Sequence, residues 1–235
     1  MSSLLLALDT ATRRASVALC RGEQVLAQAS REVTTHSEGL VLLMDETLRQ
    51  ASVTVQQVEV FVCGQGPGSF TGLRIGMATV KGLCLASSRP MVCVCSLLPL
   101  ALAAGETAEA GQLVAAVLDA RRHEIYVGLY RDGAPLAAPT VCPPERLADL
   151  VPAQESVILA GDGALAYRDR LLGALGRASM AAEGCHQIEA RYLAHAALPR
   201  VAAADFDDLH TAVPLYIRAT DAKLPALPQD RRGKT

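Results

Sequence analysis

The order of apolar and polar residues is the same in two separate parts of the chain. In the first part, an apolar run ends at Asp9, an arginine pair and a second apolar run follow, and Gly22 marks a turn. The same order returns with Asp119 and Gly133, at offsets of 110 residues between the aspartates and 111 between the glycines. Apolar runs separated by glycine turns are typical of β-hairpins. The pattern therefore predicts a duplicated unit that opens with a strand and a hairpin.

Further apolar runs predict the remaining elements of each half. The glycine-ended run 60–66 is echoed by the run 157–163, and each indicates another strand. In the first half, Thr35 and Glu38 form a capping box for a helix over 36–51, a second helix starts near Ser69 or Thr71, and a strand covers 91–95. In the second half we expect strands near 113–118, 124–130 and 157–160, followed by helices near 164–175 and 188–203.

These elements predict an α/β protein with two mixed-sheet lobes. The first lobe spans residues 1–104 and the second, reduced lobe spans 105–223. The helix near 188–203 is a candidate to pack back on the first lobe. Residues 224–235 combine prolines with basic residues, which is typical of a disordered tail.

Composition and charge exclude several classes of protein. The chain has 51% hydrophobic and 20% charged residues, which indicates a globular protein. No apolar run is long enough to cross a membrane. A formal net charge of −2 argues against tight nucleic-acid binding by the chain alone. The first residues lack the features of a signal peptide, so we expect a cytoplasmic protein in which the seven cysteines are reduced and serve packing.

The glycine-rich stretch 64–76 lies between a predicted strand and a predicted helix. Such a loop can direct backbone N–H groups at a phosphate, but it matches neither the Walker nor the dinucleotide-binding spacing. The alternative is a tight turn with close helix packing. Two aspartates add to the phosphate hypothesis, because Asp9 and Asp119 could face each other across a cleft and organise a metal-bound nucleotide. Each aspartate could equally be a turn former at a strand end. The candidate nucleotide-binding residues are Asp9, Thr10, Thr12, Gly66, Gly68, Ser69 and Asp119.

The two helices of the first half are candidates for a partner interface. The second helix has apolar or small residues around most of its circumference. One of its faces can pack on the sheet of its own lobe, and a second face then needs a partner. Packing against an equivalent helix pair would form a four-helix bundle, and the isolated chain could form a homodimer through the same surface. The candidate interface residues are Leu40, Leu43, Met44, Leu48, Leu73, Met77, Ala78, Val80, Gly82 and Ala86. No histidine spacing indicates a metal site, and no motif indicates a catalytic nucleophile.

Six segments together resemble the TsaB (YeaZ) family: residues 6–12, 35–38, 66–76, 118–122, 161–163 and 214–218. The resemblance implies an actin-like ATPase fold (ASKHA, RNase H-like). It also implies a role in attaching threonylcarbamoyl to adenosine 37 of tRNA (t6A), beside a catalytic TsaD-like paralogue and a TsaE-like ATPase. The TsaD paralogue holds its metal with a His-x-x-x-His motif, whose two positions fall here on Ser96 and Leu100. The resemblance therefore implies a non-catalytic scaffold that meets tRNA only within the complex.

The resemblance leaves two other functions open. An ATP-dependent small-molecule kinase is one, because the actin-like superfamily contains many kinases. A glycoprotease-type metallopeptidase is the other, and the histidine spacing disfavours it. We expect no resident cofactor, with a weak ATP or ADP and Mg²⁺ site in the assembled complex as the alternative.

Overall fold

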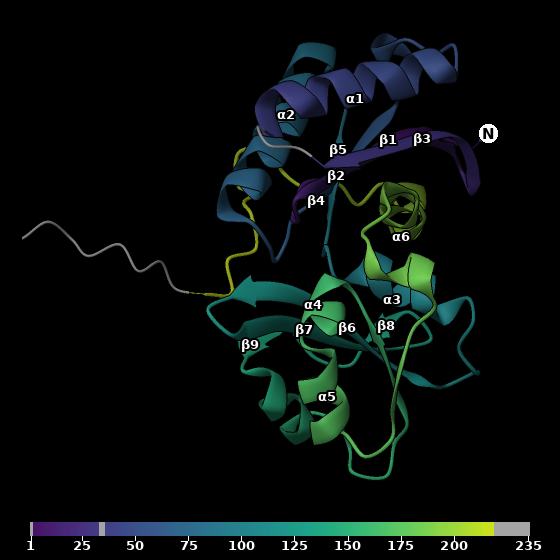
Figure 1. Cartoon of the computed structure of the whole chain (residues 1–235). Coiled ribbons are helices and arrows are strands. Elements are labelled where there is room, and N and C mark those ends of the chain that lie inside the picture. The colour runs from purple at the N-terminus through teal and green to yellow at the C-terminus, as the bar shows by residue number, and fades with distance from the viewer. Residues whose placement is uncertain (1, 33–35, 219–235) are drawn as a thin grey trace, which may run out of the picture.

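The computed structural model describes residues 2–32 and 36–218, with the side chains of 36–38 left out. Its two β-sheets lie in separate lobes, one above the other in Figure 1. The first sheet has the order β3-β2-β1-β4-β5. Its strands are β1 (Leu4–Asp9), β2 (Arg14–Arg21), β3 (Gln24–Glu32), β4 (Val60–Gly64) and β5 (Met91–Val94). The second sheet has the order β11-β10-β6-β7-β8, and β9 also pairs with β7. Its strands are β6 (Leu113–Arg121), β7 (Glu124–Arg131), β8 (Ala134–Pro135), β9 (Thr140–Cys142), β10 (Val157–Ala160) and β11 (Ala178–Met180).

The two sheets repeat one topology. In the first, β1 pairs antiparallel with β2 and parallel with β4, which in turn pairs parallel with β5. In the second, β6 pairs antiparallel with β7 and parallel with β10, which in turn pairs parallel with β11. The predicted duplication and the mixed α/β class are therefore confirmed.

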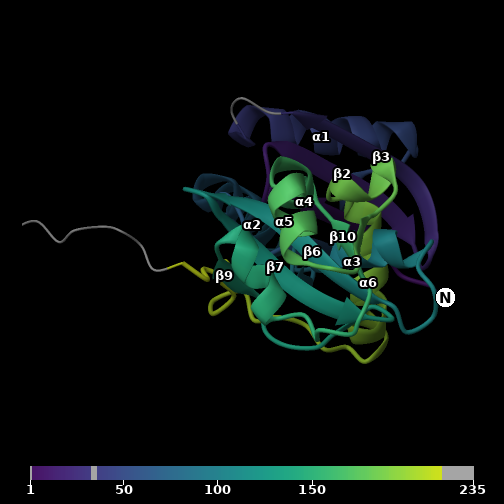
Figure 2. The same ribbon diagram turned by 60° about the horizontal axis from the view of Figure 1, so that its bottom comes forward.

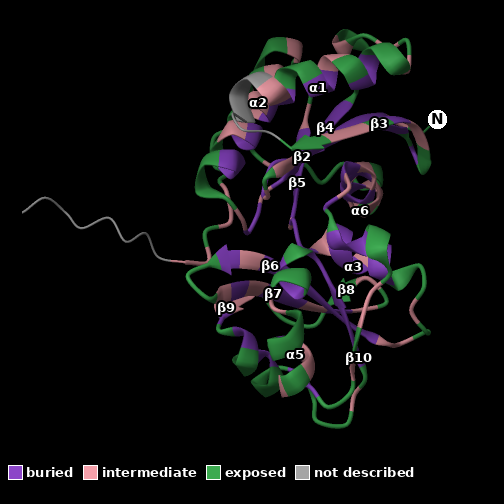
Figure 3. Cartoon of the chain, in the orientation of Figure 1, coloured by how far each residue is buried: buried purple, intermediate pink, exposed green. Residues whose placement is uncertain are grey.

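Helices cover both faces of the first sheet. Helices α1 (His36–Gln50) and α2 (Phe70–Ser87) lie side by side on its outer face, where Leu40, Met77 and Val80 pack against the sheet. Helix α6 (Ala190–Ala202) covers the inner face with Leu193 and Ala197. The candidate helix of the second half thus does pack on the first sheet. Its apolar side chains meet the inward residues of β1 and β2, so β1 and β2 are buried along most of their length, whereas β3 stays partly exposed (Figure 3).

The second sheet is also covered on both faces. Helix α3 (Leu98–Gly105) lies between the lobes and contacts α6 and β6. The outer face is covered by α4 (Asp162–Ala166), α5 (Arg168–Ala174) and the 3-10 turn η2 (Pro144–Asp149). Two further 3-10 turns are η1 (Val55–Gln57) and η3 (Glu183–His186). Figure 2 shows α3 and α6 from below, behind the strands of the second sheet.

The single helix expected near 164–175 is wrong, because the chain forms two short helices there. Tyr167 ends α4 and caps α5 with a φ of −117°, which lies outside the helical range. The other predicted helices and strands fall within a few residues of their expected positions, whereas α3, β9 and β11 were not predicted. The capping box at Thr35 and Glu38 and the expected tail 224–235 lie outside the described residues. Within the described residues, no helix is both long and apolar enough to span a membrane.

A C-terminal segment over 205–218 joins the two lobes. The Asp207 N–H donates to the carbonyl of Met91 on the edge strand β5, at 3.0 Å. Further on, the Leu215 N–H donates to the carbonyl of Gln65 at 2.7 Å. Arg218 then reaches the second lobe, where its Nη1 donates to the carbonyl of Ala120 at 3.0 Å. Residues 205–218 therefore connect the edge of the first sheet to the end of β6.

Candidate functional site: the cleft between the lobes

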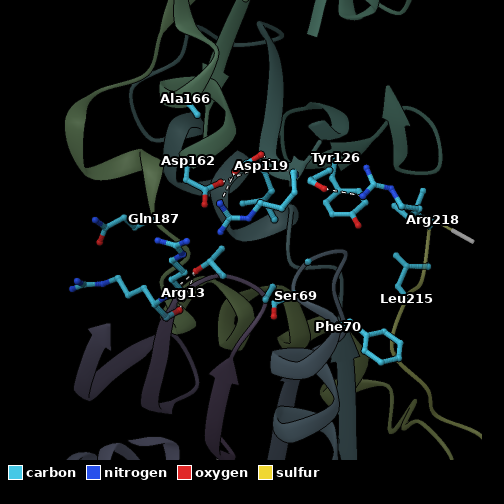
Figure 4. Close-up of a pocket in the computed structure, with 18 of the residues that line it drawn as sticks. Arg13, Ser69, Phe70, Asp119, Tyr126, Asp162, Ala166, Gln187, Leu215 and Arg218 are labelled. Atoms are coloured by element: carbon cyan, nitrogen blue, oxygen red, sulfur yellow. Dashed lines mark hydrogen bonds and ion pairs between the residues drawn. The ribbon is translucent and has the colours of Figure 1, made fainter. Parts of the chain in front are cut away.

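A cleft of about 990 Å³ lies between the two lobes, where the turn after β1 faces the turn after β6. Figure 4 shows Arg13, Ser69 and Phe70 on one side of it and Asp119 and Asp162 on the other. The C-terminal segment closes one end with residues 215–218. The turns after the corresponding strands β1 and β6 thus line the same cleft. Of the candidate nucleotide-binding residues, Thr12, Gly68, Ser69 and Asp119 line this cleft.

Asp9 does not line the cleft, which corrects its expected role opposite Asp119. The Asp9 side chain is fully buried. The Ser96 hydroxyl donates to Oδ2 of Asp9 at 2.6 Å, and the Ala11 N–H donates to Oδ1 at 2.7 Å. Burial raises the pKa of Asp9 to about 6, although both hydrogen bonds favour the charged form. The turn-forming alternative therefore describes Asp9 better than metal binding does.

The glycines of the 64–76 loop serve close packing. A Cβ on Gly68 would lie 2.3 Å from the carbonyl oxygen of Ala11, and one on Gly72 would lie 2.1 Å from that of Thr10. The Thr10 hydroxyl in turn donates to the carbonyl of Gly72 at 2.8 Å, and Thr10 is buried. The start of helix α2 therefore packs directly against the turn after β1. A side chain at either glycine would clash with a backbone carbonyl of that turn. Thr10 and Gly66 accordingly lie outside the cleft lining.

Several N–H groups of the 64–76 loop are bonded within the protein. The Ser69 N–H donates to the carbonyl of Ala11 at 2.7 Å, and the Gly66 N–H donates to the Ser96 hydroxyl at 3.0 Å. The Ser69 hydroxyl accepts from the Gly72 N–H and caps α2. Together with the buried Asp9, this arrangement does not fit a magnesium-bound nucleotide held between two strand-end carboxylates.

Asp119 does reach the cleft, and its carboxylate also stabilises its own turn. Oδ1 accepts from the Arg121 N–H at 2.8 Å and from the Tyr167 hydroxyl at 3.3 Å, while Oδ2 pairs with the Arg121 guanidinium at 3.1 Å. The following turn is unusual, because Arg121, Arg122 and His123 have φ values of 62°, 53° and 62°. Left-handed backbone costs an L-residue about 1–2 kcal/mol. Asp119 therefore forms a strand-end turn, as the alternative interpretation expected, and it also lines the cleft.

Arginines outnumber carboxylates in the cleft lining. The carboxylates are Glu32, Asp119 and Asp162, and the arginines are Arg13, Arg14, Arg121, Arg122 and Arg218. Arg14 is held by the Ser30 hydroxyl, which accepts from its Nε at 3.0 Å. Arg218 forms an ion pair with Glu124. Arg13 is exposed and makes no hydrogen bond or ion pair with any residue that the structure describes.

An exposed aromatic pair lies at the rim of the cleft beside the start of α2. The rings of Phe70 and Tyr216 have centroids 5.2 Å apart, and each residue is 42% exposed. The Arg74 guanidinium lies 3.8 Å from the centre of the Phe70 ring and donates through Nε to the Tyr216 hydroxyl at 3.0 Å. Sequence pattern alone does not identify this pair, because its two members are 146 residues apart. The arginine pairs after Asp9 and Asp119 were visible in the sequence as part of the repeat.

Most of the expected partner-interface residues are inside the core, which corrects that prediction. Leu40 is fully buried and Leu48 is only 8% exposed, because α1 turns this face towards the first sheet. The others that the protein buries are Leu43, Met44, Leu73, Met77 and Val80. By contrast, the small-residue stripe of α2, defined by Ala78, Gly82 and Ala86, is exposed. The exposed Leu85 lies on the same helix, and Leu42 on the neighbouring helix α1 is exposed as well.

The cysteines follow the prediction of free, packed thiols. All seven are unpaired, and six of them are buried while Cys95 is partly exposed. Burial raises the pKa of Cys84 to about 11 and that of Cys93 to about 12. A raised pKa keeps a thiol protonated and unreactive near neutral pH.

The repeated sheets and the cleft between them define the class as a protein of the actin-like ATPase fold. The (R)-2-hydroxyglutaryl-CoA dehydratase component A of Acidaminococcus fermentans shares this fold with a TM-score of 0.56 at 12% identity, over 86% of this chain and all of its own. A family model described as TsaD, tRNA N6-adenosine threonylcarbamoyltransferase, matches residues 27–223. YeaZ from Pseudomonas aeruginosa is 31% identical with a TM-score of 0.78, over 91% of this chain and 99% of that one. The chain therefore belongs to the TsaD family and resembles its TsaB (YeaZ) members.

Curated relatives carry the TsaB name. The tRNA threonylcarbamoyladenosine biosynthesis protein TsaB of Haemophilus influenzae is 40% identical over 127 residues, which are 52% of this chain and 51% of that protein. The matched segment thus spans about half the length of that relative.

Proposed function

We propose that the protein is a non-catalytic subunit for threonylcarbamoyl transfer to adenosine 37 of tRNA. The observation that carries this proposal is the TsaD-family match over residues 27–223 together with the structural use of Ser96 and Leu100. The Ser96 hydroxyl is bonded to the buried Asp9, and Leu100 is fully buried in the core beneath the second sheet. Both positions thus serve packing here, whereas the catalytic paralogue is expected to place metal-binding histidines there.

The subunit would work beside a TsaD-like catalytic paralogue and a TsaE-like ATPase. The small-residue stripe (Ala78, Gly82 and Ala86) is the surface that we assign to the paralogue. Small residues four apart on one helix let a second helix approach closely. The exposed Leu85 and Leu42 would lose contact with water in the same interface. When the paralogue is absent, two copies of the chain could pair through this stripe.

The test is reconstitution of the modification with purified components. Unmodified tRNA is incubated with the TsaD-like paralogue, the TsaE-like ATPase and the substrates of the transfer, with and without this protein. We expect t6A, measured by mass spectrometry of the digested nucleosides, only when this protein is present. The proposal fails if the mixture reaches the same yield without it, or if the isolated chain modifies tRNA by itself.

The same preparation separates the proposal from the kinase alternative. A kinase would transfer phosphate from ATP to a small molecule without any paralogue. Such turnover by the isolated chain would favour the kinase. Peptide-bond cleavage by the isolated chain would favour a peptidase in the same way.

A further inference from the structure

The arginine pairs of the repeat, Arg13 with Arg14 and Arg121 with Arg122, have no role in the proposal above. They belong to corresponding turns, one after β1 and one after β6, and all four line the cleft. Since the two lobes are related by duplication, the pairs approach the same space from opposite sides. Figure 4 shows Arg13 below Asp119, across the gap between the two turns. The duplication thus produces a cleft with a cationic turn on each wall.

One arginine of each turn, Arg13 and Arg121, is largely exposed. Arg13 is exposed and makes no hydrogen bond or ion pair with the described residues. Arg121 pairs with Asp119, yet its side chain remains 61% exposed. The backbone around Arg121 and Arg122 is left-handed over consecutive residues, without a glycine or asparagine to relieve it. Backbone strain of this kind persists where the surrounding structure fixes it and is concentrated at functional sites.

The rim of the cleft adds a surface on which a base can stack. Phe70 and Tyr216 are both 42% exposed, and Arg74 lies over the Phe70 ring. Exposed aromatic rings beside arginines are the usual means of binding unpaired nucleotides, because every base has a stacking face. Arginines bind phosphate oxygens through paired N–H groups.

The geometry favours a chain of phosphodiesters over a single nucleotide. Polyphosphates of a free nucleotide need concentrated N–H donors or a metal, and here the loop N–H groups of Gly66 and Ser69 and the carboxylate of Asp9 are already bonded within the protein. The arginines lie on both walls of a cleft of about 990 Å³. The singly charged phosphates along a nucleic-acid backbone match this spacing of arginines.

We propose that this cleft binds the phosphate backbone of RNA, with an unpaired base stacked on Phe70 and Tyr216. The inference rests on the proposed function, in which the RNA is the tRNA being modified. With a net charge of −2 the chain alone binds weakly, so the cleft acts as an added contact surface within the complex.

The experiment measures the affinity of the assembled complex for unmodified tRNA at several salt concentrations. The variants are Arg13→Glu and Arg121→Gln in the cleft, with Arg146→Glu as the matched control on η2, where the side chain is 69% exposed. Losing one phosphate contact lowers the slope of log affinity against log salt by about 0.8. Between about 50 and 200 mM salt, the wild type should therefore lose about threefold more affinity than either cleft variant. The control should match the wild type.

Three results would overturn the proposal. The first is an unchanged salt slope in both cleft variants. The second is loss of ATP or AMP binding with unchanged tRNA affinity, which would make the cleft a nucleotide site. The third is failure of Arg13→Glu to bind the paralogue, which would make the turn a protein contact. Arg13→Gln is the milder variant if Arg13→Glu does not fold. Failure of the proposed function itself would appear separately, as wild-type complexes that bind tRNA but form no t6A.

Discussion

Replacing Gly82 by leucine should separate the partner surface from the fold. Gly82 lies on the exposed side of α2, and a Cβ there would meet no atom within 4 Å. The substitution therefore introduces no clash within the chain. A leucine is favoured over glycine inside a helix by about 0.7 kcal/mol, so the variant should unfold about 2 °C higher than the wild type.

The same substitution should weaken binding of the chain to the paralogue and to a second copy of itself. Helices that pack through small residues lie about 8–10 Å apart, and a leucine between them has no space. Overpacking of this kind costs about 1–3 kcal/mol, which corresponds to about 5-fold to 150-fold weaker binding. A gain in folding stability with a loss of association is a combination that general destabilisation cannot produce.

The assay combines light scattering of the isolated chain with titration of the TsaD-like paralogue, and circular dichroism follows thermal unfolding. Gly173→Leu is the matched control, because Gly173 on α5 is also a helical glycine with no atom within 4 Å of its Cβ position. Gly82→Ala should give a smaller effect than Gly82→Leu. The reasoning is refuted if Gly82→Leu is folded and binds both the paralogue and itself as tightly as the wild type does.

Three further predictions concern the interior. Asp9→Asn should remove a pH dependence of stability. The wild-type pKa is raised from 3.8 to about 6, so the free energy of unfolding of the wild type should fall by about 2 kcal/mol as the pH rises from 4 to 6, and that of the variant should not. Urea unfolding that shows a pH-independent difference between the two would contradict this. Gly72→Ala should destabilise the protein by about 2 kcal/mol or more, because its Cβ would lie 2.1 Å from a carbonyl oxygen. Gly82→Ala on the same helix should stabilise it by about 1 kcal/mol. If the two variants shift the unfolding temperature in the same direction, close packing does not explain the glycine at position 72. In the native protein, a thiol reagent should react with Cys95 at most, because the other six cysteines are buried, and all seven should react in denaturant. Rapid labelling of several thiols in the native state would contradict this burial.

Elements defined by local periodicity could be predicted from the sequence. Strands β1, β4, β6 and β10 are continuous apolar runs, and the repeat fixed their order in both lobes. The start of α2 near Ser69 or Thr71 was predicted from the sequence, and the structure places the N-cap at Ser69. The split at Tyr167 did not follow, because apolar residues continue through both short helices at a spacing compatible with one.

Features of the site that depend on contacts distant in sequence could not be predicted. The pairing of Phe70 with Tyr216 requires the path of residues 205–218 along both lobes. The turn at Arg121 and Arg122 lacks the glycine or asparagine that normally indicates left-handed backbone, so its conformation has no local signal. Whether Asp9 faces a cleft or the core depends on Ser96, which is 87 residues away.

The two halves have diverged in how they use the same strand end. In the first half, Asp9 is buried outside the cleft lining and its carboxylate accepts from the Ser96 hydroxyl, and a Cβ on Gly64 would lie 1.9 Å from its Oδ2. In the second half, Asp119 faces the cleft but is paired with Arg121. Both carboxylates are thus engaged within the protein, and the arginines that follow them are left to face the cleft. Turning Asp9 into the cleft would break its bonds to Ser96 and Ala11 and leave the Ser96 hydroxyl, which holds the Gly66 N–H, without its acceptor. Charge in the cleft can therefore be changed at less structural cost through the exposed Arg13 than through either aspartate.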